Sequence, residues 1–223
     1  HIHTTYLDNP HLPAQFVEQM RKLKETDPEK YRHLVLGGWI ERPDGLVFKH
    51  WEEGTFNTYL PYIHALDFGF SPDPLAMGKI AIDRRRKEVY LKQKVYDTEL
   101  STKEVIAAVR NGIDSRNDLI MCDTSEGRLF AELKAAGLNV KMVSKKNTTR
   151  GGSVITDIRE LHDWKIIIDP YSYDAKREFN SYVWDDKKSS IPKDADNHFP
   201  DVLRYGWRRL VGYPNLKGVR QIN

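Results

Sequence analysis

Two hydrophobic periodicities alternate along most of the chain. From residue 62 onward, short apolar runs typical of strands alternate with segments in which apolar residues recur every three or four positions, as on one face of a helix. Strands are expected at residues 62–70, 75–82, 88–96, 118–123, 140–144 and 165–168. Helices are expected at residues 101–112, 126–136, 153–162, 174–184 and 200–211. This order predicts an α/β fold, in which a mixed sheet starts as an antiparallel meander, continues with parallel strands and carries helices on both faces.

Local sequence signals support the ends of several of these elements. Ser101 and Glu104 have the spacing of a capping box, which marks the start of a helix. Gly137 follows a helical segment, as a C-terminal glycine commonly does, and Pro200 falls in the first turn of the last helix. The basic run 83–87 joins two strands and is interpreted as a hairpin turn. The complete order of elements suits a ribonuclease-H-like architecture.

The first 60 residues differ from the rest of the chain. They predict a helix at 13–24, a second short helix at 28–34 and a strand at 45–48. Because this part offers little apolar material for a core of its own, we expect residues 1–60 to be a connecting segment and 61–223 to be the main domain. The chain begins with His1, so it is expected to be a piece of a longer polypeptide.

Composition narrows the class of protein. The formal net charge is only +3, so a surface for nucleic acid would need local clustering of basic residues. The single cysteine, Cys122, excludes a disulfide framework and a cysteine-rich zinc site within one chain. No segment resembles a secretory signal, and no apolar run approaches the roughly 18 residues of a membrane span. We therefore expect a soluble intracellular protein with no membrane partner.

Three aspartates occupy positions where a carboxylate is costly. Asp67 lies within the first apolar strand, Asp123 ends the strand at 118–123, and Asp201 lies in the first turn of the last helix. Carboxylates that are buried together repel one another unless a cation compensates them, and oxygen ligands suit Mg²⁺ or Mn²⁺. Two such ions about 3.5–4 Å apart can activate a water and stabilise the leaving oxygen in phosphodiester hydrolysis. The pattern predicts a two-metal site, with Asp67 bridging the ions and the other two aspartates each holding one.

Two of these aspartates also have structural alternatives. Asp123 could cap the helix that begins near Glu126, and Asp201 could simply favour the helix dipole. No capping role is available to Asp67 in the middle of a strand. The three together, in this order along the chain, are more specific than any one of them. Glu126 and Asp196 are further candidate ligands.

A histidine adds to the third position. His198 lies three residues before Asp201, where an imidazole can bind a metal, orient a water or contact a phosphate. The alternative is an exposed loop histidine. Arg204, one turn further along the helix, is interpreted as a salt-bridge partner.

These motifs together resemble a known family. Residues 66–69 resemble the first acidic strand of the C-terminal nuclease domain of the large terminase subunit of tailed bacteriophages, the DNA-packaging motor. Residues 121–126 resemble the second acidic motif, with Gly127 where a proline is common. Residues 197–205 are similar to the third motif, His-x-x-Asp-x-x-Arg-Tyr, with Val202 in place of a frequent alanine.

The resemblance implies a function for the chain and for the protein from which it comes. Asp67, Asp123 and Asp201 would bind two Mg²⁺ or Mn²⁺ ions and, with His198, cut double-stranded concatemeric viral DNA when packaging starts and ends. Residues 1–60 would lead from an upstream ATPase domain, although the chain itself has no P-loop motif. The small terminase subunit and the portal protein would be partners in the host cytoplasm. The fragment is expected to be monomeric, and the full-length protein oligomeric on the procapsid.

Two other functions stay open. Another ribonuclease-H-like nuclease, such as a junction resolvase, would share the acidic triple but not the third motif or the front segment. A docking module for DNA or the portal, without catalysis, would not need an intact acidic triple.

Two groups of basic residues are candidates for DNA contact. Arg84, Arg85 and Arg86 lie at the predicted hairpin tip, and Lys145 and Lys146 follow the strand at 140–144. Both groups could neutralise phosphates, which would give salt-dependent binding with little sequence preference. For the hairpin, an ordinary solvated turn is the alternative. The lysines are favoured because the expected topology brings that strand end towards the acidic cluster.

Overall fold

The chain divides into two compact units, residues 1–44 and residues 45–223. The structure, a computed structural model, describes residues 9, 11–26, 45–69, 73–123, 126–143, 154–185 and 188–212. In the first unit the described element is helix α1 (Ala14–Thr26), which confirms the helix expected at 13–24. The short helix expected at 28–34 lies outside the described residues.

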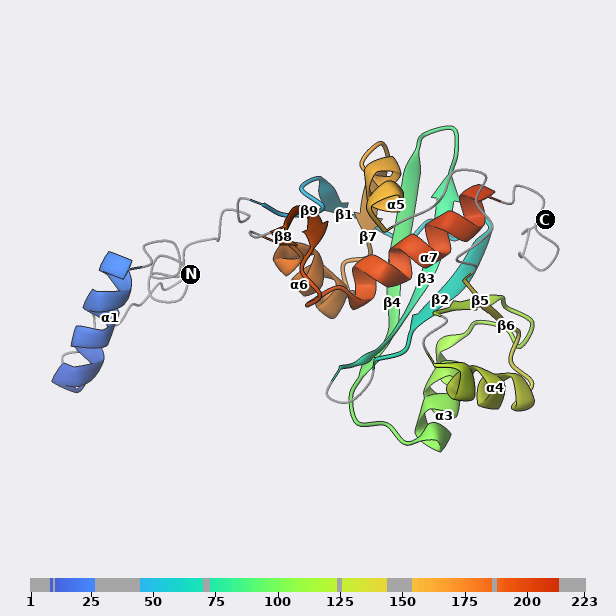
Figure 1. Ribbon diagram of the computed structural model, residues 1–223, viewed down its shortest axis with the longest axis horizontal. Helices are drawn as coiled ribbons and strands as arrows, with labels where there is room; N and C mark the ends of the chain where they lie inside the picture. The colour runs from blue at the N-terminus through green and yellow to red at the C-terminus, as the bar shows by residue number, and fades with distance from the viewer. Residues whose placement is uncertain are drawn as a thin grey trace. The chain divides into compact units, whose positions relative to one another are not determined.

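A seven-stranded mixed sheet forms the centre of the second unit (Figure 1). Its strands are β1 (Trp51–Glu53), β2 (Tyr62–Asp67), β3 (Leu75–Asp83), β4 (Glu88–Asp97), β5 (Ile120–Cys122), β6 (Val140–Met142) and β7 (Lys165–Ile168). They lie in the order β1-β7-β4-β3-β2-β5-β6. The pairs β2–β3 and β3–β4 are antiparallel, and the other neighbours are parallel. The expected antiparallel meander followed by parallel strands is therefore confirmed.

Helices cover both faces of this sheet, as expected. They are α3 (Thr102–Gly112), α4 (Gly127–Ala135), α5 (Val154–Leu161), α6 (Tyr173–Ser181) and α7 (His198–Gly212). The larger core lies under α5, α6 and α7 and includes Phe179 and Leu203. A second core, on the other face, includes Val109 of α3 and Leu133 of α4. Figure 1 shows α7 lying across the strands of the sheet, with α3 and α4 grouped beyond β2.

The second unit begins earlier than the sequence predicted. Its boundary is at Gly45 and not at residue 61, because the residues between them belong to its core and its sheet. Leu46, Val47 and Phe48 are almost completely buried. Leu46 forms only an isolated antiparallel bridge with Val183, so the strand expected at 45–48 is wrong, and the strand of this region is β1, which pairs in parallel with β7.

A small hairpin precedes α7 and was not predicted. It consists of β8 (Trp184–Asp185) and β9 (Lys188–Pro192), which pair in antiparallel. The helix expected at 174–184 ends at Ser181 instead. The residues that follow it, at 182–184, are aromatic and β-branched, and such side chains favour extended backbone.

The ends of the other elements follow the local signals. The capping box at α3 is present, since the Ser101 N–H donates to Glu104 Oε2 at 2.8 Å and the Glu104 N–H donates to Ser101 Oγ at 3.4 Å. In the part of the chain that the structure describes, no helix combines the length and the apolar character needed to cross a lipid bilayer.

Candidate functional site

Two of the predicted aspartates lie side by side at one edge of the sheet. Strands β2 and β5 are parallel neighbours, and Leu66 is paired with Cys122. The next residue along each strand is an aspartate, so Asp67 and Asp123 both follow this last pair. Ala65 of β2 belongs to the core beneath α7, and side chains two positions apart in a strand point to the same face. Asp67 therefore points towards the face that α7 covers.

Close packing brings α7, and with it Asp201, down onto this face. Helix α7 packs across β2 and β3. A Cβ atom placed on Gly206 would lie only 2.5 Å from Ile80 Cγ1, and one placed on Gly78 would lie 2.8 Å from Val202 Cγ1. Glycines on both sides of the interface thus allow the helix to approach the sheet more closely than a larger residue would permit.

The charges of the aspartates interact across this interface. Burial, and after it the nearby Asp201 carboxylate, raise the pKa of Asp67 to about 8, and Asp123 contributes in the same direction. Burial also raises the pKa of Asp201, although Arg204 opposes this. Carboxylates that are hard to ionise together, and that only partly face solvent, form a donor set suited to a hard divalent cation. The residues therefore fit the metal that the motifs imply.

Asp201 is held by its own helix. Arg204 donates from Nε at 3.2 Å and from Nη2 at 3.0 Å to Asp201 Oδ1. The Tyr205 hydroxyl donates to Asp201 Oδ2 at 3.3 Å. Arg204 is therefore a salt-bridge partner, as the sequence indicated. Asp201 keeps only 18% of its side chain exposed, so its position reflects these bonds and not a free surface turn.

Arg204 has a second carboxylate partner that the sequence analysis missed. Its Nη1 donates to Asp157 Oδ2 at 3.3 Å, and Arg208 Nη1 reaches the same oxygen at 3.4 Å. Asp157 is buried in α5 beside Ile158, on the face of that helix that meets the core. An acid on the apolar face of a helix was the signal that could have identified it.

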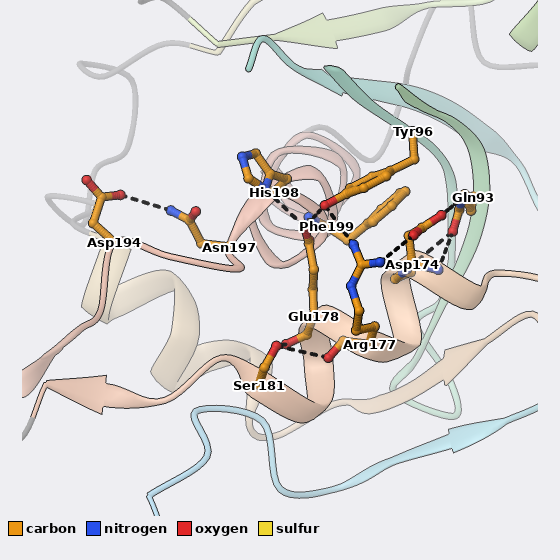
Figure 2. Close-up of polar contacts among 11 residues, drawn as sticks. Gln93, Tyr96, Asp174, Arg177, Glu178, Ser181, Asp194, Asn197, His198 and Phe199 are labelled. Carbon is orange, nitrogen blue, oxygen red and sulfur yellow. Dashed lines mark hydrogen bonds and ion pairs between the residues drawn. The ribbon is translucent and has the colours of Figure 1, made fainter. Parts of the chain in front are cut away.

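His198 is the first residue of α7, and its side chain is only 13% exposed. The alternative of an exposed loop histidine is therefore wrong. Its Nδ1 lies 2.9 Å from Glu178 Oε1 (Figure 2). Although burial opposes a charge on the ring, the hydrogen bond to Glu178 raises the pKa of His198, and Asp67 adds to the effect. The charges of His198 and Asp67 thus influence each other.

Glu178 is the other residue that the sequence analysis missed. It is completely buried in α6, on the stripe formed with Ala175 and Phe179. A carboxylate at such a position needs hydrogen-bond donors, and the spacing of three and four residues from its apolar neighbours could have shown that it faces the core.

The further candidate ligands have different surroundings. Glu126 occupies the N-cap position of α4, so Asp123 is not the capping residue of that helix. Glu126 also lines a pocket with Gly69 and Asp73, just beyond the end of β2. Asp196 is exposed and has a left-handed backbone conformation, with φ of 51°.

A second acidic group lies near the opposite end of β2. Among the described residues, His64, Asp114 and Asp118 are the group whose ligand atoms all lie within 4.8 Å of one another, a spacing that Asp67, Asp123 and Asp201 do not meet. Lys79 and Lys94 contact Asp114 at 2.7 and 2.8 Å. The ammonium groups of Lys79 and Lys94 already neutralise this cluster, so it is an ion-pair network. It therefore differs from the site of Asp67, Asp123 and Asp201, whose carboxylates repel one another.

The basic hairpin lies at the other end of the sheet from the aspartates. Asp67 pairs with Ala76 near the start of β3, whereas Arg84 follows the end of that strand, about 25 Å away at ~3.3 Å per residue. Arg84 Nη2 donates to the carbonyl of Leu210 and, at 3.1 Å, to that of Val211 at the end of α7.

The other basic candidates divide between this turn and an undescribed segment. The backbone N–H groups of Arg85 and Arg86 donate to Asp83 Oδ1, and both side chains are exposed. Lys145 and Lys146 lie outside the described residues.

The chain matches known proteins over most of its length. The family model described as the terminase RNase H-like domain matches residues 67–207, and the model described as the phage terminase large subunit matches residues 1–38. The large terminase subunit of Bacillus phage SPP1 is 34% identical over 93% of this chain. The match covers 51% of that protein, so the chain spans about half of its length.

Solved structures show the same fold. The nuclease domain of the SPP1 large terminase, solved with bound Mn, is 28% identical with a TM-score of 0.60, over 71% of this chain and 94% of that domain. The nuclease domain of the P22 large terminase also has a TM-score of 0.60, at 19% identity, over 75% of this chain and 94% of that domain. The resemblance that the motifs indicated is thus confirmed, and the chain belongs to the family of phage terminase large subunits, with residues 67–207 matching its ribonuclease-H-like domain.

Proposed function

We propose that this chain is a divalent-metal-dependent endonuclease that cuts double-stranded concatemeric viral DNA at the initiation and termination of genome packaging. The observation that carries the proposal is the convergence of Asp67 and Asp123, from neighbouring parallel strands, with Asp201 from the helix packed over them. The mutual repulsion of these carboxylates supports a role in binding cations. The Mn found with the SPP1 nuclease domain, the relative of 28% identity, is in line with it.

Each residue of the site has a proposed role. Asp67, on the central strand, would bind both of two Mg²⁺ or Mn²⁺ ions, Asp123 one of them, and Asp201 the other. When bound, such ions supply a polarised water and neutralise charge on the scissile phosphate. Arg204 holds the Asp201 carboxylate in one orientation through two hydrogen bonds. His198 would contact the phosphate or a ligand of the ion from the first turn of α7.

The rest of the protein is also part of the proposal. Residues 1–44 would belong to the end of an ATPase domain, in line with the family match over residues 1–38. Double-stranded DNA, the small terminase subunit and the portal protein would be the partners in the host cytoplasm. We expect this fragment to be monomeric and the full-length protein to be oligomeric on the procapsid.

Plasmid digestion tests the nuclease. Supercoiled DNA is incubated with the protein in Mn²⁺, Mg²⁺ or EDTA, and the wild type is compared with Asp67→Asn and with Asp163→Asn, a control at an exposed position. We expect cleavage with a metal in the wild type and the control, and at least a hundredfold less in Asp67→Asn. Cleavage that persists in EDTA would exclude the mechanism, and DNA binding without any cleavage would favour the docking module.

A further inference from the structure

One buried carboxylate joins three separate parts of the second unit. Glu178 of α6 is completely buried and accepts hydrogen bonds from β4 and from α7 (Figure 2). Its Oε1 lies 2.9 Å from His198 Nδ1 and accepts the Tyr96 hydroxyl proton at 2.8 Å. Its Oε2 accepts the backbone N–H of Phe199 at 2.6 Å. The elements that contribute these donors lie far apart along the chain and meet at this one side chain.

The contact with Phe199 fixes the start of the helix. The first N–H groups of a helix have no partner inside it, and a negative charge is favourable at that end. Glu178 supplies both an acceptor and a charge, but from another helix. The turn that begins at His198 and includes Asp201 is therefore tied to α6 and, through Tyr96, to β4. The Tyr96 ring also stacks on that of Phe199, with ring centroids 5.6 Å apart.

The contact with His198 fixes which ring nitrogen carries the proton. A carboxylate oxygen can only accept a hydrogen bond, so Nδ1 must be the donor in the pair with Glu178. In a neutral ring the other nitrogen, Nε2, is then left without a proton and is free to act as an acceptor or a ligand. Carboxylate–histidine pairs serve this purpose at many metal sites.

We propose that Glu178 is the positioning residue of this site, which sets the tautomer and orientation of His198 so that an unprotonated Nε2 serves the chemistry at Asp67 and Asp201. The proposal rests on the proposed nuclease function. Glu178 does not itself contact the reacting groups: it acts through His198 and through the first turn of α7. His198 lies three residues before Asp201 in α7, so the two side chains are neighbours on one face of the helix.

The variant Glu178→Gln makes a specific prediction because an amide has one acceptor and one donor end. The Phe199 N–H is part of the backbone and cannot turn away, so the amide oxygen must face it. The amide NH₂ group then faces Nδ1 of His198, which can pair with it only as an acceptor. The ring proton should therefore move to Nε2, the opposite of the wild-type arrangement.

Nuclear magnetic resonance of the imidazole nitrogens measures this change directly, without metal and without cleavage. Spectra are recorded on the alkaline side of the ring's titration, and the His198 signals are assigned by their loss in His198→Asn. We expect the proton on Nδ1 in the wild type and in Tyr96→Phe, and on Nε2 in Glu178→Gln. The same tautomer in wild type and Glu178→Gln would overturn the proposal.

Cleavage and metal binding provide the second readout. Loss of such a supporting residue commonly lowers metal affinity or activity about 10- to 100-fold, and we expect a loss of that size in Glu178→Gln. Glu132→Gln, at an exposed position of α4, is the matched control and should be unchanged. In the double variant with His198→Asn, Glu178→Gln should cause no further loss. Additive losses would mean that Glu178 supports only the fold, and would overturn the proposal.

Two outcomes separate this proposal from the nuclease assignment. A wild type that binds no Mn²⁺ and cuts no DNA would count against the nuclease, while the tautomer would still test the role of Glu178. A change of tautomer with full cleavage would overturn the positioning role alone. If Glu178→Gln does not fold, Glu178→Asp keeps the charge but shortens its reach to His198. In that variant an unchanged preference for Nδ1–H, with full activity, would equally overturn the proposal.

Discussion

The guanidinium of Arg204 directs two N–H groups to a single oxygen of Asp201, at 3.2 and 3.0 Å, and a third to Asp157 at 3.3 Å. One buried side chain therefore both orients a proposed metal ligand and neutralises a buried acid of α5. Burial opposes the charge on the guanidinium, but Asp201 raises the pKa of Arg204 above its ordinary value. The arginine is thus expected to matter for stability as well as for cleavage.

Replacing this arginine is the first prediction. Among the described residues, Arg204→Gln leaves Asp157 with Arg208 as its cationic partner, and breaking a buried ion pair commonly costs about 3–5 kcal/mol. We expect the free energy of unfolding, measured with urea, to fall by about 3 kcal/mol, and cleavage to fall at least tenfold. Arg128→Gln, at an exposed position of α4, should change neither quantity. Equal stability of the two variants would show that the pair contributes nothing net.

The contact between Gly206 and Ile80 leads to a second prediction. A methyl group on Gly206 would overlap Ile80, and overpacking of a core commonly costs about 1–3 kcal/mol. Gly206→Ala should therefore lower the melting temperature and, by lifting α7 from the sheet, reduce cleavage. Gly127→Ala is the control, because a Cβ there meets no atom within 4 Å. A Gly206→Ala protein as stable and active as the control would contradict the close approach.

Repulsion among the aspartates leads to a third prediction, about metal removal. In EDTA, Asp67→Asn removes the cost of burying a carboxylate and, after it, the repulsion with Asp201, so the variant should unfold at a higher temperature than the wild type. Added Mn²⁺ should raise the melting temperature of the wild type, because it binds the folded state, and should have little effect on the variant. Calorimetry in EDTA and in Mn²⁺ measures both values. A variant that gains as much from Mn²⁺ as the wild type would place the binding site elsewhere.

The ion pairs of Asp114 give a pH prediction with a definite sign. Although burial opposes ionisation, the hydrogen bonds from Lys79 and Lys94 lower the pKa of Asp114 to about 2, from 3.8. A pKa that is lower in the folded state stabilises the protein at pH values above the ordinary pKa of 3.8. This stabilisation is lost as the pH falls from about 4 through 2. Near neutral pH, the free energy of unfolding of the wild type, measured with urea, should exceed that of Asp114→Asn by about 1 kcal/mol, allowing for solvent screening. A difference that persists at pH 2 would point to a cause other than this charge.

The basic hairpin should divide into two functions. All three arginines are exposed, but Arg84 also donates to a carbonyl at the end of α7. Removing Arg85 and Arg86 together should weaken DNA binding at low salt and reduce the salt dependence by about one unit of slope per lost phosphate contact. Arg84→Ala should mainly lower the melting temperature. An unchanged DNA affinity of the double variant would mean that the hairpin is an ordinary solvated turn and does not contact DNA.

Local patterns were enough to predict most strands of the sheet, although not β1, and to place Asp67 within one of them. The strands β2, β3 and β4 are apolar runs separated by recognisable turns, so their order and the antiparallel meander could be inferred. Asp67 could be singled out because a carboxylate inside such a run is unfavourable by itself. What a residue does within its own strand or helix is largely encoded by its near neighbours.

Remote partners could not be predicted in the same way. Asp157 precedes Arg204 by 47 positions, and Glu178 precedes His198 by 20, so neither pairing has a local signal. The early start of the second unit was missed for the same reason, since the bridge partner of the buried Leu46 is Val183, far along the chain. The strand β8 likewise depends on pairing with β9, and its first residue was included in the helix expected at 174–184.

The 15 residues of α7 form a rod about 22 Å long that is clamped at both ends. Glu178 accepts a hydrogen bond from the backbone of its first turn, and Arg84 of the hairpin donates one to the backbone of its last turn. The helix therefore cannot tilt or slide along the sheet without breaking one of these hydrogen bonds. The positions of His198 and Asp201 over the sheet thus depend on these two end contacts as well as on the close packing at Gly206 and Gly78. Loss of either contact is therefore expected to shift His198 and Asp201 together, because both lie in the first turn of the same helix.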